Sequence, residues 1–429
     1  KNWFPDLTLI ELNKDVHTYD TVDKWIRKSY RGGWCYLVKG KENKVFSNGL
    51  TADVNSLYPS EMHSSSGNRY PIGVPKFWCG NYIPEEALKP NKYYFIRIKT
   101  RFYLKKGYLP FIQIKGKYIY KGTESLVTSD YYDNKLGMYC QYYKDKYGNT
   151  IDTKQELVLT MTDYELIKEH YELVDFEIID GCYFYAQVGI FDEYLDKYKQ
   201  MKSKGAKRTL AKLFLNNLYG KLASSDDSSF KYAYLKDDNV VGFYNVEAHD
   251  KKAGYIAIGS AITSYARNFT IRHAQMNYHG ENERGFIYAD TDSIHCDLFP
   301  DEVVGLKIHK SDFNCWKLES YWDSAIFARQ KTYIEHVTHE DGEAVEPYYN
   351  IKCAGMPQKC KNLLNESLTG AQKNKEEYTE EEQKFLYKGD EKILRNLEDF
   401  KEGLIVPGKL LPKRILGGVL LTETNYEMR

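Results

Sequence analysis

Three aspartates in two widely separated strings limit what this chain can fold into. Asp290 and Asp292 lie on either side of a single residue, and the pattern around them predicts a β-hairpin. The apolar residues 285–289 predict the first strand of the hairpin, and the β-prone residues 293–298 predict the second. Asp53 fits the end of a second strand beside this hairpin. The chain is therefore expected to form a sheet that brings three carboxylates together at one edge.

Carboxylates in this arrangement suit phosphoryl transfer, which depends on fixed charge more than on covalent help from the protein. Two divalent ions about 4 Å apart serve the attacking and leaving oxygens in such reactions. Magnesium takes oxygen ligands, commonly one or two carboxylates. A single acidic residue is usually solvated surface, so the prediction depends on all three together. His295 follows the turn, but magnesium prefers oxygen, and we expect a strand side chain.

A basic helix is predicted between these strings. Lys212, Asn216 and Tyr219 recur at i, i+4 and i+7, which places them on one helix face. Residues 197–221 include eight Lys or Arg and no Asp or Glu, a favourable local field for a triphosphate. Gly220 is the expected helix stop. The ordinary alternative is a solvated basic face.

Five strings resemble the motifs of family B DNA polymerases. DVNSLYPSEM (53–62), KLFLNNLYG (212–220) and YADTDS (288–293) resemble the nucleotide-adding centre. YRGG (30–33) resembles the YxGG element, and KTY (331–333) resembles the KxY element that grips the primer strand. The resemblance implies a mixed α/β, right-hand polymerase fold with palm, fingers and thumb.

Two insertions narrow the resemblance to protein-primed polymerases of small tailed bacteriophages and linear plasmids. Residues 65–188 and 224–252 look like the two terminal-protein regions of that group. Segments 107–115, 329–333 and 352–356 are also similar to it. The expected domains are 1–64, lead and first palm part; 65–188, terminal-protein region 1; 189–223, fingers; 224–252, terminal-protein region 2; 253–358, palm; and 359–429, thumb.

The resemblance also implies roles for individual residues. Asp53 and Asp292 are implied metal ligands with the backbone carbonyl of Val54, and Asp290 is implied to tune this catalytic site from close by. Tyr58 is implied to exclude a sugar 2′-hydroxyl. The implied nucleotide-binding residues are Ser56, Leu57, Tyr58, Lys202, Lys212, Asn216 and Tyr219, and the implied DNA-binding residues are Tyr30, Gly32, Gly33, Arg267, Lys331 and Tyr333.

Two positions depart from the family pattern. Asn217 stands where the fingers motif usually has Ser, and the interval from Lys202 to Lys212 is slightly short. Family members also carry an amino-terminal 3′–5′ exonuclease domain with a D-x-E pair, and none precedes Tyr30. We expect either a piece of a longer gene product or an exonuclease that was lost or encoded separately.

The implied reaction adds deoxynucleotides to a primer 3′-hydroxyl, or to a hydroxyl of a terminal protein, with release of pyrophosphate. The implied partners are a DNA primer–template, a deoxynucleoside triphosphate and a terminal (priming) protein. Two Mg²⁺ ions, replaceable by Mn²⁺, are the implied cofactors. The expected setting is the cytoplasm of a phage-infected or plasmid-bearing host. A primer-independent family B polymerase and a non-catalytic module that binds DNA or the priming protein stay open.

The charge balance, hydropathy and cysteine and tyrosine content of the chain limit which functions and sites it can have. The chain has 60 Lys and Arg and 60 Asp and Glu, so a DNA track must be built from local basic patches. A mean hydropathy of -0.60 and the lack of an 18-residue apolar run argue against a membrane span. Eight cysteines without C-x-x-C or zinc spacing predict reduced thiols. The 39 tyrosines invite a reading as stacking platforms for single-stranded DNA, but outside the motifs we interpret them as core and surface filling.

Periodicity and turn residues predict the other elements. The predicted helices cover 20–30, 163–171, 191–201 and 259–275, the last packing beneath the hairpin at Asp290, and a helix that starts with a capping box at Thr379 and runs to about residue 400. The predicted strands cover 93–101 and 109–114, with an inserted hairpin or loop over 130–152 and a closing hairpin that turns at residues 417–418.

Overall fold

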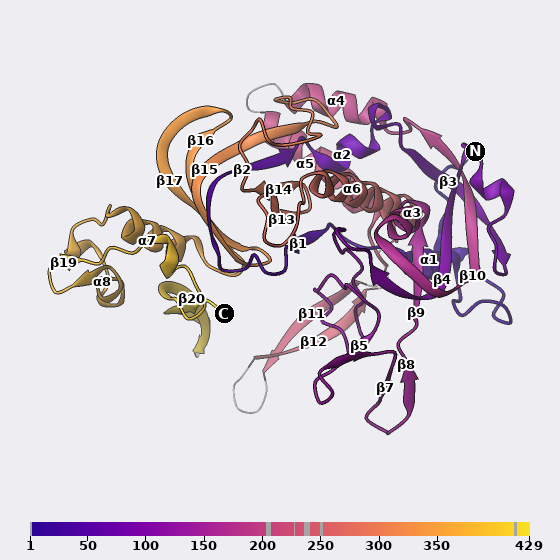
Figure 1. Cartoon of the computed structure of the whole chain (residues 1–429), viewed down its shortest axis with the longest axis horizontal. Coiled ribbons are helices and arrows are strands. Elements are labelled where there is room, and N and C mark those ends of the chain that lie inside the picture. Colours follow the sequence, from indigo (N-terminus) through magenta and orange to yellow (C-terminus); the bar gives the residue numbers. More distant parts are fainter. Residues whose placement is uncertain (1, 203–206, 227, 236–240, 249–251, 416–417) are drawn as a thin grey trace.

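The computed structural model describes residues 2–202, 207–226, 228–235, 241–248, 252–415 and 418–429. A seven-stranded sheet lies near the middle of the molecule, a four-stranded sheet lies toward one end of the long axis, and the C-terminal helices and hairpins lie at the other end (Figure 1). The protein is therefore mixed α/β, as predicted. No helix within the described ranges combines the length and apolar character that a membrane span requires.

The central sheet is antiparallel, with the order β1-β13-β14-β2-β15-β16-β17. β13 and β14 form the predicted hairpin, and Ser293 of β14 lies opposite Asp53 of β2. The sheet therefore joins the two strings that carry the aspartates. The strands are β1 (Cys35–Leu37), β2 (Val45–Val54), β13 (Phe286–Asp290), β14 (Ser293–Cys296), β15 (Trp316–Arg329), β16 (Thr332–Glu340) and β17 (Glu343–Cys353).

Helix α6 (Ile256–Met276) packs against the hairpin, as predicted for residues 259–275. Residues 256–267 of the helix are all buried, and many of them are small, which allows close packing. The Thr270 hydroxyl donates to the carbonyl of Thr291 at 2.7 Å, so the helix supports the turn of the hairpin. Helices α1 (Val22–Arg27), α2 (Leu57–Met62) and α3 (Met161–His170) pack against α6.

The four-stranded sheet has the order β3-β10-β4-β9. Its strand β4 confirms the prediction over 93–101, but the strand predicted over 109–114 is wrong. That segment makes one isolated bridge, from Ile112 to Leu126. The backbone N–H groups of Phe111 and Ile112 donate to the Tyr171 hydroxyl instead of to a neighbouring strand. The strands are β3 (Arg69–Cys79), β4 (Lys92–Leu104), β9 (Gln155–Thr160) and β10 (Tyr171–Val188).

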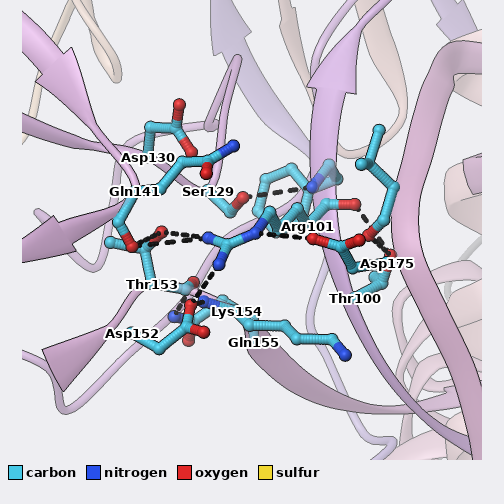
Figure 2. A network of polar contacts seen from close by, with 12 residues as sticks. Thr100, Arg101, Ser129, Asp130, Gln141, Asp152, Thr153, Lys154, Gln155 and Asp175 are labelled. Carbon is cyan, nitrogen blue, oxygen red and sulfur yellow. Dashed lines mark hydrogen bonds and ion pairs between the residues drawn. The ribbon is translucent and has the colours of Figure 1, made fainter.

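Two short hairpins occupy the segment predicted as an inserted hairpin or loop. They consist of β5 (Tyr131–Asp133) with β6 (Met138–Cys140), and β7 (Tyr142–Lys144) with β8 (Thr150–Asp152). Arg101 of β4 is 2% exposed and fixes them to the larger sheet. Its guanidinium pairs with Asp152 at 2.7 Å and Asp175 at 3.1 Å, and it donates to the Thr153 hydroxyl at 3.0 Å (Figure 2).

Helices α4 (Asp192–Lys202) and α5 (Arg208–Leu222) lie along one edge of the molecule (Figure 1). The helix stop predicted at Gly220 is wrong, since α5 continues for two residues. The segment after Gly220 packs closely on Gly254, where an added Cβ would lie 2.4 Å from the Leu222 carbonyl oxygen. β11 (Ser228–Leu235) and β12 (Val241–Ala248) follow as a hairpin. Parts of the predicted insertion over 224–252 lie outside the described residues.

The C-terminal region packs on the last strands of the central sheet, and Ile326, Ile334 and Ile351 of those strands share its core. The capping box predicted at Thr379 is present, with Glu382 as its partner. The helix ends at Leu386, so its predicted extension to about residue 400 is wrong. The chain turns back at Gly389, which has φ 63°. The closing hairpin is confirmed, although residues 416–417 of its turn lie outside the described residues. The elements of this region are α7 (Gln358–Thr369), α8 (Glu380–Leu386), β18 (Tyr387–Lys388), β19 (Glu391–Lys392), β20 (Ile405–Ile415) and β21 (Gly418–Glu427). Across the whole chain, the described 3₁₀ helices are Leu7–Leu9, Ser64–Ser66, Glu85–Leu88, Lys375–Glu377 and Leu397–Asp399.

Candidate active site

The three predicted carboxylates meet at one edge of the central sheet. The backbone N–H of Val54, which follows Asp53, donates to the carbonyl of Asp292 at 2.7 Å. Between the hairpin carboxylates, Thr291 has φ 58°, and its N–H donates to the carbonyl of Trp34 at 2.7 Å. These bonds fix the turn against both neighbouring strands. The three carboxylates line a cavity of about 690 Å³.

The electrostatics of this edge favour an added cation. Burial, together with the nearby charges of Asp292 and Glu319, raises the pKa of Asp53 to about 8. Burial also raises the pKa of Asp292; its backbone hydrogen bond opposes the rise, and the charges of Asp290 and Glu319 add to it. Oxygen donors with surplus negative charge fit a hard divalent ion.

Asp290 differs from the other two aspartates because it has a cation of its own. The Lys331 ammonium lies 2.7 and 3.0 Å from the two carboxylate oxygens of Asp290. Burial lowers the pKa of Lys331, but the hydrogen bond to Asp290 and the nearby negative charges together outweigh burial and leave that pKa raised. The Lys331 backbone N–H donates to the Tyr288 hydroxyl at 2.9 Å, and Tyr333 lines the same cavity. The KTY string therefore lies beside the hairpin.

An aromatic cluster joins three of the strings. The ring centroid of Tyr58 lies 4.5 Å from that of Tyr219, and the Tyr219 hydroxyl is hydrogen-bonded to the Tyr30 hydroxyl. Burial raises the pKa of Tyr58 to about 12. Ser56 adopts the left-handed conformation, with φ 50° and ψ 64°, at the start of α2, and the following Leu57 is buried. Residues predicted to bind one nucleotide are thus neighbours.

The basic helix lies near the carboxylates. The positive charge of Lys212 lowers the pKa of both Asp53 and Asp292, against the larger effect of burial. Lys212 and Asn216 are exposed on α5, so a ligand in front of the carboxylates can reach both. The side chain of Lys202 lies outside the described residues. The role of each of these residues stays a prediction.

The glycine loop packs directly on the carboxylate turn. Gly32 and Gly33 are exposed, and an added Cβ on Gly33 would lie 2.4 Å from the Thr291 hydroxyl oxygen. A side chain at that position would displace the turn between the hairpin carboxylates. Gly33 therefore lets the loop approach closely, whereas an added Cβ on Gly32 would meet no atom within 4 Å.

Arg267 does not reach the surface at which DNA contact was predicted. It is 5% exposed, and its guanidinium donates to the carbonyls of Arg31 and Gly32 at 2.6 and 2.7 Å. Asp163 pairs with the same guanidinium at 2.6 Å. These contacts satisfy and compensate the Arg267 guanidinium inside the protein. The geometry therefore supports a role in holding the glycine loop instead of direct DNA binding.

Sequence reasoning missed two charged residues of β15. Lys317 lies opposite Asp53 in the sheet, and Glu319 lines the cavity. Glu319 raises the pKa of Asp53 while Lys317 lowers it. Lys317 also pairs with Asp341 at 2.7 Å. Neither residue lies in a recognisable motif, and only the pairing of β15 with β2 reveals them.

A buried polar network beneath the site was also missed. His295 is a strand side chain, as predicted, and its Nδ1 lies 2.5 Å from the Glu335 carboxylate and 3.0 Å from the Thr51 hydroxyl. Thr51 donates to the same Glu335 oxygen at 2.9 Å. The Tyr333 ring centroid lies 4.8 Å from that of His295. The network links β2 and β14 to the strand that follows the KTY turn.

A second group of possible metal ligands lies at the four-stranded sheet. Possible ligand atoms of His17, Cys79 and Asp180 all lie within 4.8 Å of one another. Arg97, however, pairs with both oxygens of Asp180 at 2.8 and 2.7 Å, and His17 Nδ1 lies 3.0 Å from one of them. The protein itself neutralises this carboxylate, so the cluster fits a structural ion pair better than a metal site.

Comparison with known proteins agrees with this geometry. Residues 10–303 match the family described as DNA polymerase type B, organellar and viral. The chain is 34% identical to a DNA polymerase of Bacillus phage Nf over 421 residues, which cover 95% of this chain and 63% of that protein. It is 32% identical to a DNA polymerase of Streptococcus phage Cp-1 over 380 residues, covering 88% of this chain and 56% of that protein. The chain thus spans about three fifths of the length of these relatives.

Solved structures show the same fold. The structure of phi29 DNA polymerase complexed with primer-template DNA and incoming nucleotide substrates matches with a TM-score of 0.73 and 33% identity. The match covers 100% of this chain and 64% of that one. Phi29 DNA polymerase complexed with single-stranded DNA matches with a TM-score of 0.71 and 31% identity.

Proposed function

Because this chain belongs to the organellar and viral type B DNA polymerases, we propose that it adds deoxynucleotides to a primer 3′-hydroxyl as a template directs, releasing pyrophosphate. Its fold is the right-hand polymerase fold, and we assign palm, fingers and thumb to the ranges predicted above. The observation that carries the proposal is the Asp53–Asp292 pair. Both carboxylates line the cavity, and neither is ion-paired with any described residue.

The donor set fits two magnesium ions, which manganese can replace. Asp53 and Asp292 would hold them together with the Val54 carbonyl, because all three supply oxygen. When bound, the ions lower the pKa of the attacking hydroxyl and stabilise charge on the triphosphate. Asp290 remains ion-paired with Lys331. It therefore influences the electrostatics of the metal site from a neighbouring position.

Side chains of the protein orient the nucleotide. Lys212 and Asn216 on α5 contact the triphosphate, where a fixed cation stabilises migrating negative charge. Ser56 and Leu57 place the start of α2 against the phosphates. Tyr58 lies under the sugar and collides with a 2′-hydroxyl. Tyr219 stacks near the new base pair, and its contact with Tyr58 supports this placement.

The primer–template lies along the hairpin edge. Lys331 and Tyr333 hold the primer strand, while Tyr30, Gly32 and Gly33 follow the template beside the hairpin turn, against which Gly33 packs. A terminal protein that offers a hydroxyl in place of the primer is a further proposed partner. It is supported by the two insertions in the sequence and by the similarity to phage polymerases.

Primer extension tests the proposal. The purified chain is incubated with a labelled primer–template, the four deoxynucleotides and millimolar Mg²⁺, and in parallel with EDTA. We expect elongation that requires the template and the metal ion. DNA binding without elongation would contradict the proposal and support a non-catalytic module, and products on a template without primer would indicate a primer-independent enzyme.

A further inference from the structure

A buried carboxylate joins two parts of the central sheet that are distant in the strand register. Glu335 on β16 is 0% exposed, and one of its carboxylate oxygens lies 2.5 Å from His295 Nδ1 and 2.9 Å from the Thr51 hydroxyl. His295 and Thr51 are paired on β14 and β2, the two strands beside the Asp53–Asp292 pair. The carboxylate therefore connects the strand that follows the KTY turn to the strands at the proposed metal site.

This contact requires the paired strands to curve. Ser320 of β15 lies opposite Thr51 on one side and opposite Glu340 on the other, so the register aligns Glu340 with Thr51. At about 3.4 Å per residue, a flat sheet would keep Glu335 roughly 15 Å or more from Thr51. Register shifts interrupt the pairing of β15 with both neighbours close to Ser320, and such irregularities bend strands. β15 and β16 curve strongly in Figure 1, and this curvature brings Glu335 onto β2.

Hydrogen bonds at one nitrogen hold the His295 ring. Its Nδ1 contacts Glu335 and Thr51, whereas its Nε2 is buried and has no hydrogen-bond partner among the described residues. Within the described part of the chain, His295 is also the one ion-pair partner of Glu335. Removal of the carboxylate would leave Nδ1 and the Thr51 hydroxyl buried without their shared acceptor. The orientation of the ring therefore depends on Glu335.

The His295 ring supports Tyr333 of the KTY turn. The two ring centroids lie 4.8 Å apart with the planes at 62°, which is an edge-on contact. Tyr288 of the hairpin also contacts Tyr333, with centroids 5.6 Å apart. Tyr333 lines the same cavity as Asp53 and Asp292, and the proposed function places it on the primer strand. The orientation of His295 therefore influences where this tyrosine lies relative to the metal site.

The second oxygen of Glu335 extends the network to the wall of the cavity. Asn350 on β17 lines the cavity and donates to this oxygen at 3.4 Å. Burial raises the pKa of Tyr333, and the negative charge of Glu335 adds to the rise, so the tyrosine hydroxyl remains a hydrogen-bond donor. A buried ion pair contributes little net stability, because desolvation offsets most of the attraction between its charges. Stability alone therefore does not account for this network.

We propose that Glu335 and His295 are positioning residues for the primer terminus. Through Tyr333, they hold the primer 3′-hydroxyl at a fixed place relative to the Asp53–Asp292 pair. This inference rests on the proposed function, which places the primer strand at Tyr333. Glu335 and His295 are both fully buried, so neither touches the primer. They should affect the rate of transfer more than the affinity for DNA or nucleotide, because small displacements of reacting groups have large effects on rate.

A set of matched variants tests the assignment. Glu335→Ala removes both oxygens, whereas Glu335→Gln keeps the shape of the side chain and supplies one acceptor and one donor in the same place. The control is Asp323→Ala, which removes an exposed carboxylate that lies 2.8 Å from His336 on the same two strands. Urea denaturation gives the folded fraction, and each rate is expressed per folded molecule. If Glu335→Ala does not fold, Thr51→Val takes its place in both measurements, with the same changes expected at smaller size and an unchanged result contradicting the assignment.

The first measurement does not depend on catalysis. A primer–template with 2-aminopurine at the primer 3′ end is titrated in EDTA, and both the affinity and the fluorescence change are recorded. Glu335→Ala should bind within about twofold of the parent, because phosphate contacts dominate the affinity for DNA. Its fluorescence change should differ clearly from that of the parent, because the terminal base is no longer held in one place. Glu335→Gln and the control should match the parent, and a parental signal in Glu335→Ala would overturn the inference.

The second measurement is single-turnover incorporation with Mg²⁺. Glu335→Ala should lower the maximal rate by about 20-fold or more with less than about a threefold change in the apparent nucleotide Kd, and Glu335→Gln should restore the rate to within about threefold. In a Tyr333→Ala background, Glu335→Ala should cost less than about twofold more, since both changes remove the same constraint.

Three outcomes of the kinetics would contradict the inference. They are additive losses in the double variant, equal defects in Glu335→Gln and Glu335→Ala, and a weakened nucleotide Kd at the parental rate. Any of them would show that the network is only part of the core. A parent that does not elongate primers would refute the proposed function, and the fluorescence in EDTA would then decide this inference separately.

Discussion

Two sites in this molecule differ in how the protein treats carboxylate charge: one compensates it internally and the other does not. Asp180 in the four-stranded sheet is held by Arg97 and His17, so its charge is compensated within the protein. Asp53 and Asp292 in the central sheet have no ion-pair partner among the described residues, and burial raises the pKa of both. A buried acid that the chain neutralises stabilises the fold. A pair that it leaves uncompensated either retains a proton, as the raised pKa of Asp53 indicates, or takes a cation from outside.

The largest expected effect comes from the uncompensated pair. Asp53→Asn or Asp292→Asn should lower the rate of primer extension by roughly 10³-fold or more, because metal-ion stabilisation of the transition state is worth several kcal/mol. Primer–template binding in EDTA should stay within a few fold. Single-turnover incorporation with Mg²⁺ measures the rate. Near-parental rates in either variant would show that catalysis does not need that carboxylate, and the proposed contrast with the structural Asp180 would fail.

The next effect concerns the compensated cluster. Asp180→Asn removes the buried partner of Arg97, which keeps only the more exposed Glu156 at 3.3 Å, and should lower the free energy of unfolding by about 3 kcal/mol. Urea denaturation measures this value. Asp20→Asn, which breaks an exposed pair with Lys24, is the control and should change stability by less than about 1 kcal/mol. Extension per folded molecule should be unchanged in both. A loss of extension in Asp180→Asn that exceeds its loss of folded protein would show that this cluster is not merely structural.

A smaller effect tests whether the aromatic cluster of Tyr58 and Tyr219 belongs to the nucleotide site. Tyr58→Val should raise ribonucleotide incorporation relative to deoxyribonucleotide by about tenfold, or about 1.4 kcal/mol of discrimination. Tyr82→Val, at an exposed ring outside the motifs, is the control. The ratio of kcat/KM for the two nucleotides is the readout. If this ratio stays constant, Tyr58 does not face the sugar.

Much of the site could be predicted because its residues lie in contiguous strings. The hairpin at Asp290 and the helix that carries Lys212 follow from local periodicity, which short-range side-chain patterns determine. Glu319 and Glu335 could not be predicted, because they reach the site only through strand pairing across the sheet. Arg267 could not be placed correctly either, since its burial depends on carbonyls that the glycine loop supplies from a distant part of the sequence.

The fold shows the same difference between features that local sequence determines and features that long-range contacts determine. Residues 93–101 form a strand because their apolar pattern and their hydrogen-bonding partners agree. Residues 109–114 have a similar pattern, but the Tyr171 hydroxyl satisfies two of their N–H groups, so no strand forms. The helix after Thr379 ends early because Gly389 reverses the chain. Tertiary contacts decided each of these outcomes.

The most direct test of the uncompensated pair is thermal unfolding at pH 8 with and without Mg²⁺. The folded pKa of Asp53 is about 8 against an ordinary 3.8, so the folded state retains a proton that the unfolded state has lost. Stability without metal should therefore fall as the pH rises between these values. Asp53→Asn, which carries no charge, should then be more stable than the parent at pH 8, with the difference vanishing near pH 4. Magnesium should raise the parent's Tm by about 2 °C or more and leave that of the variant unchanged. A variant that is less stable than the parent without metal, or an equal response of both to Mg²⁺, would contradict the account.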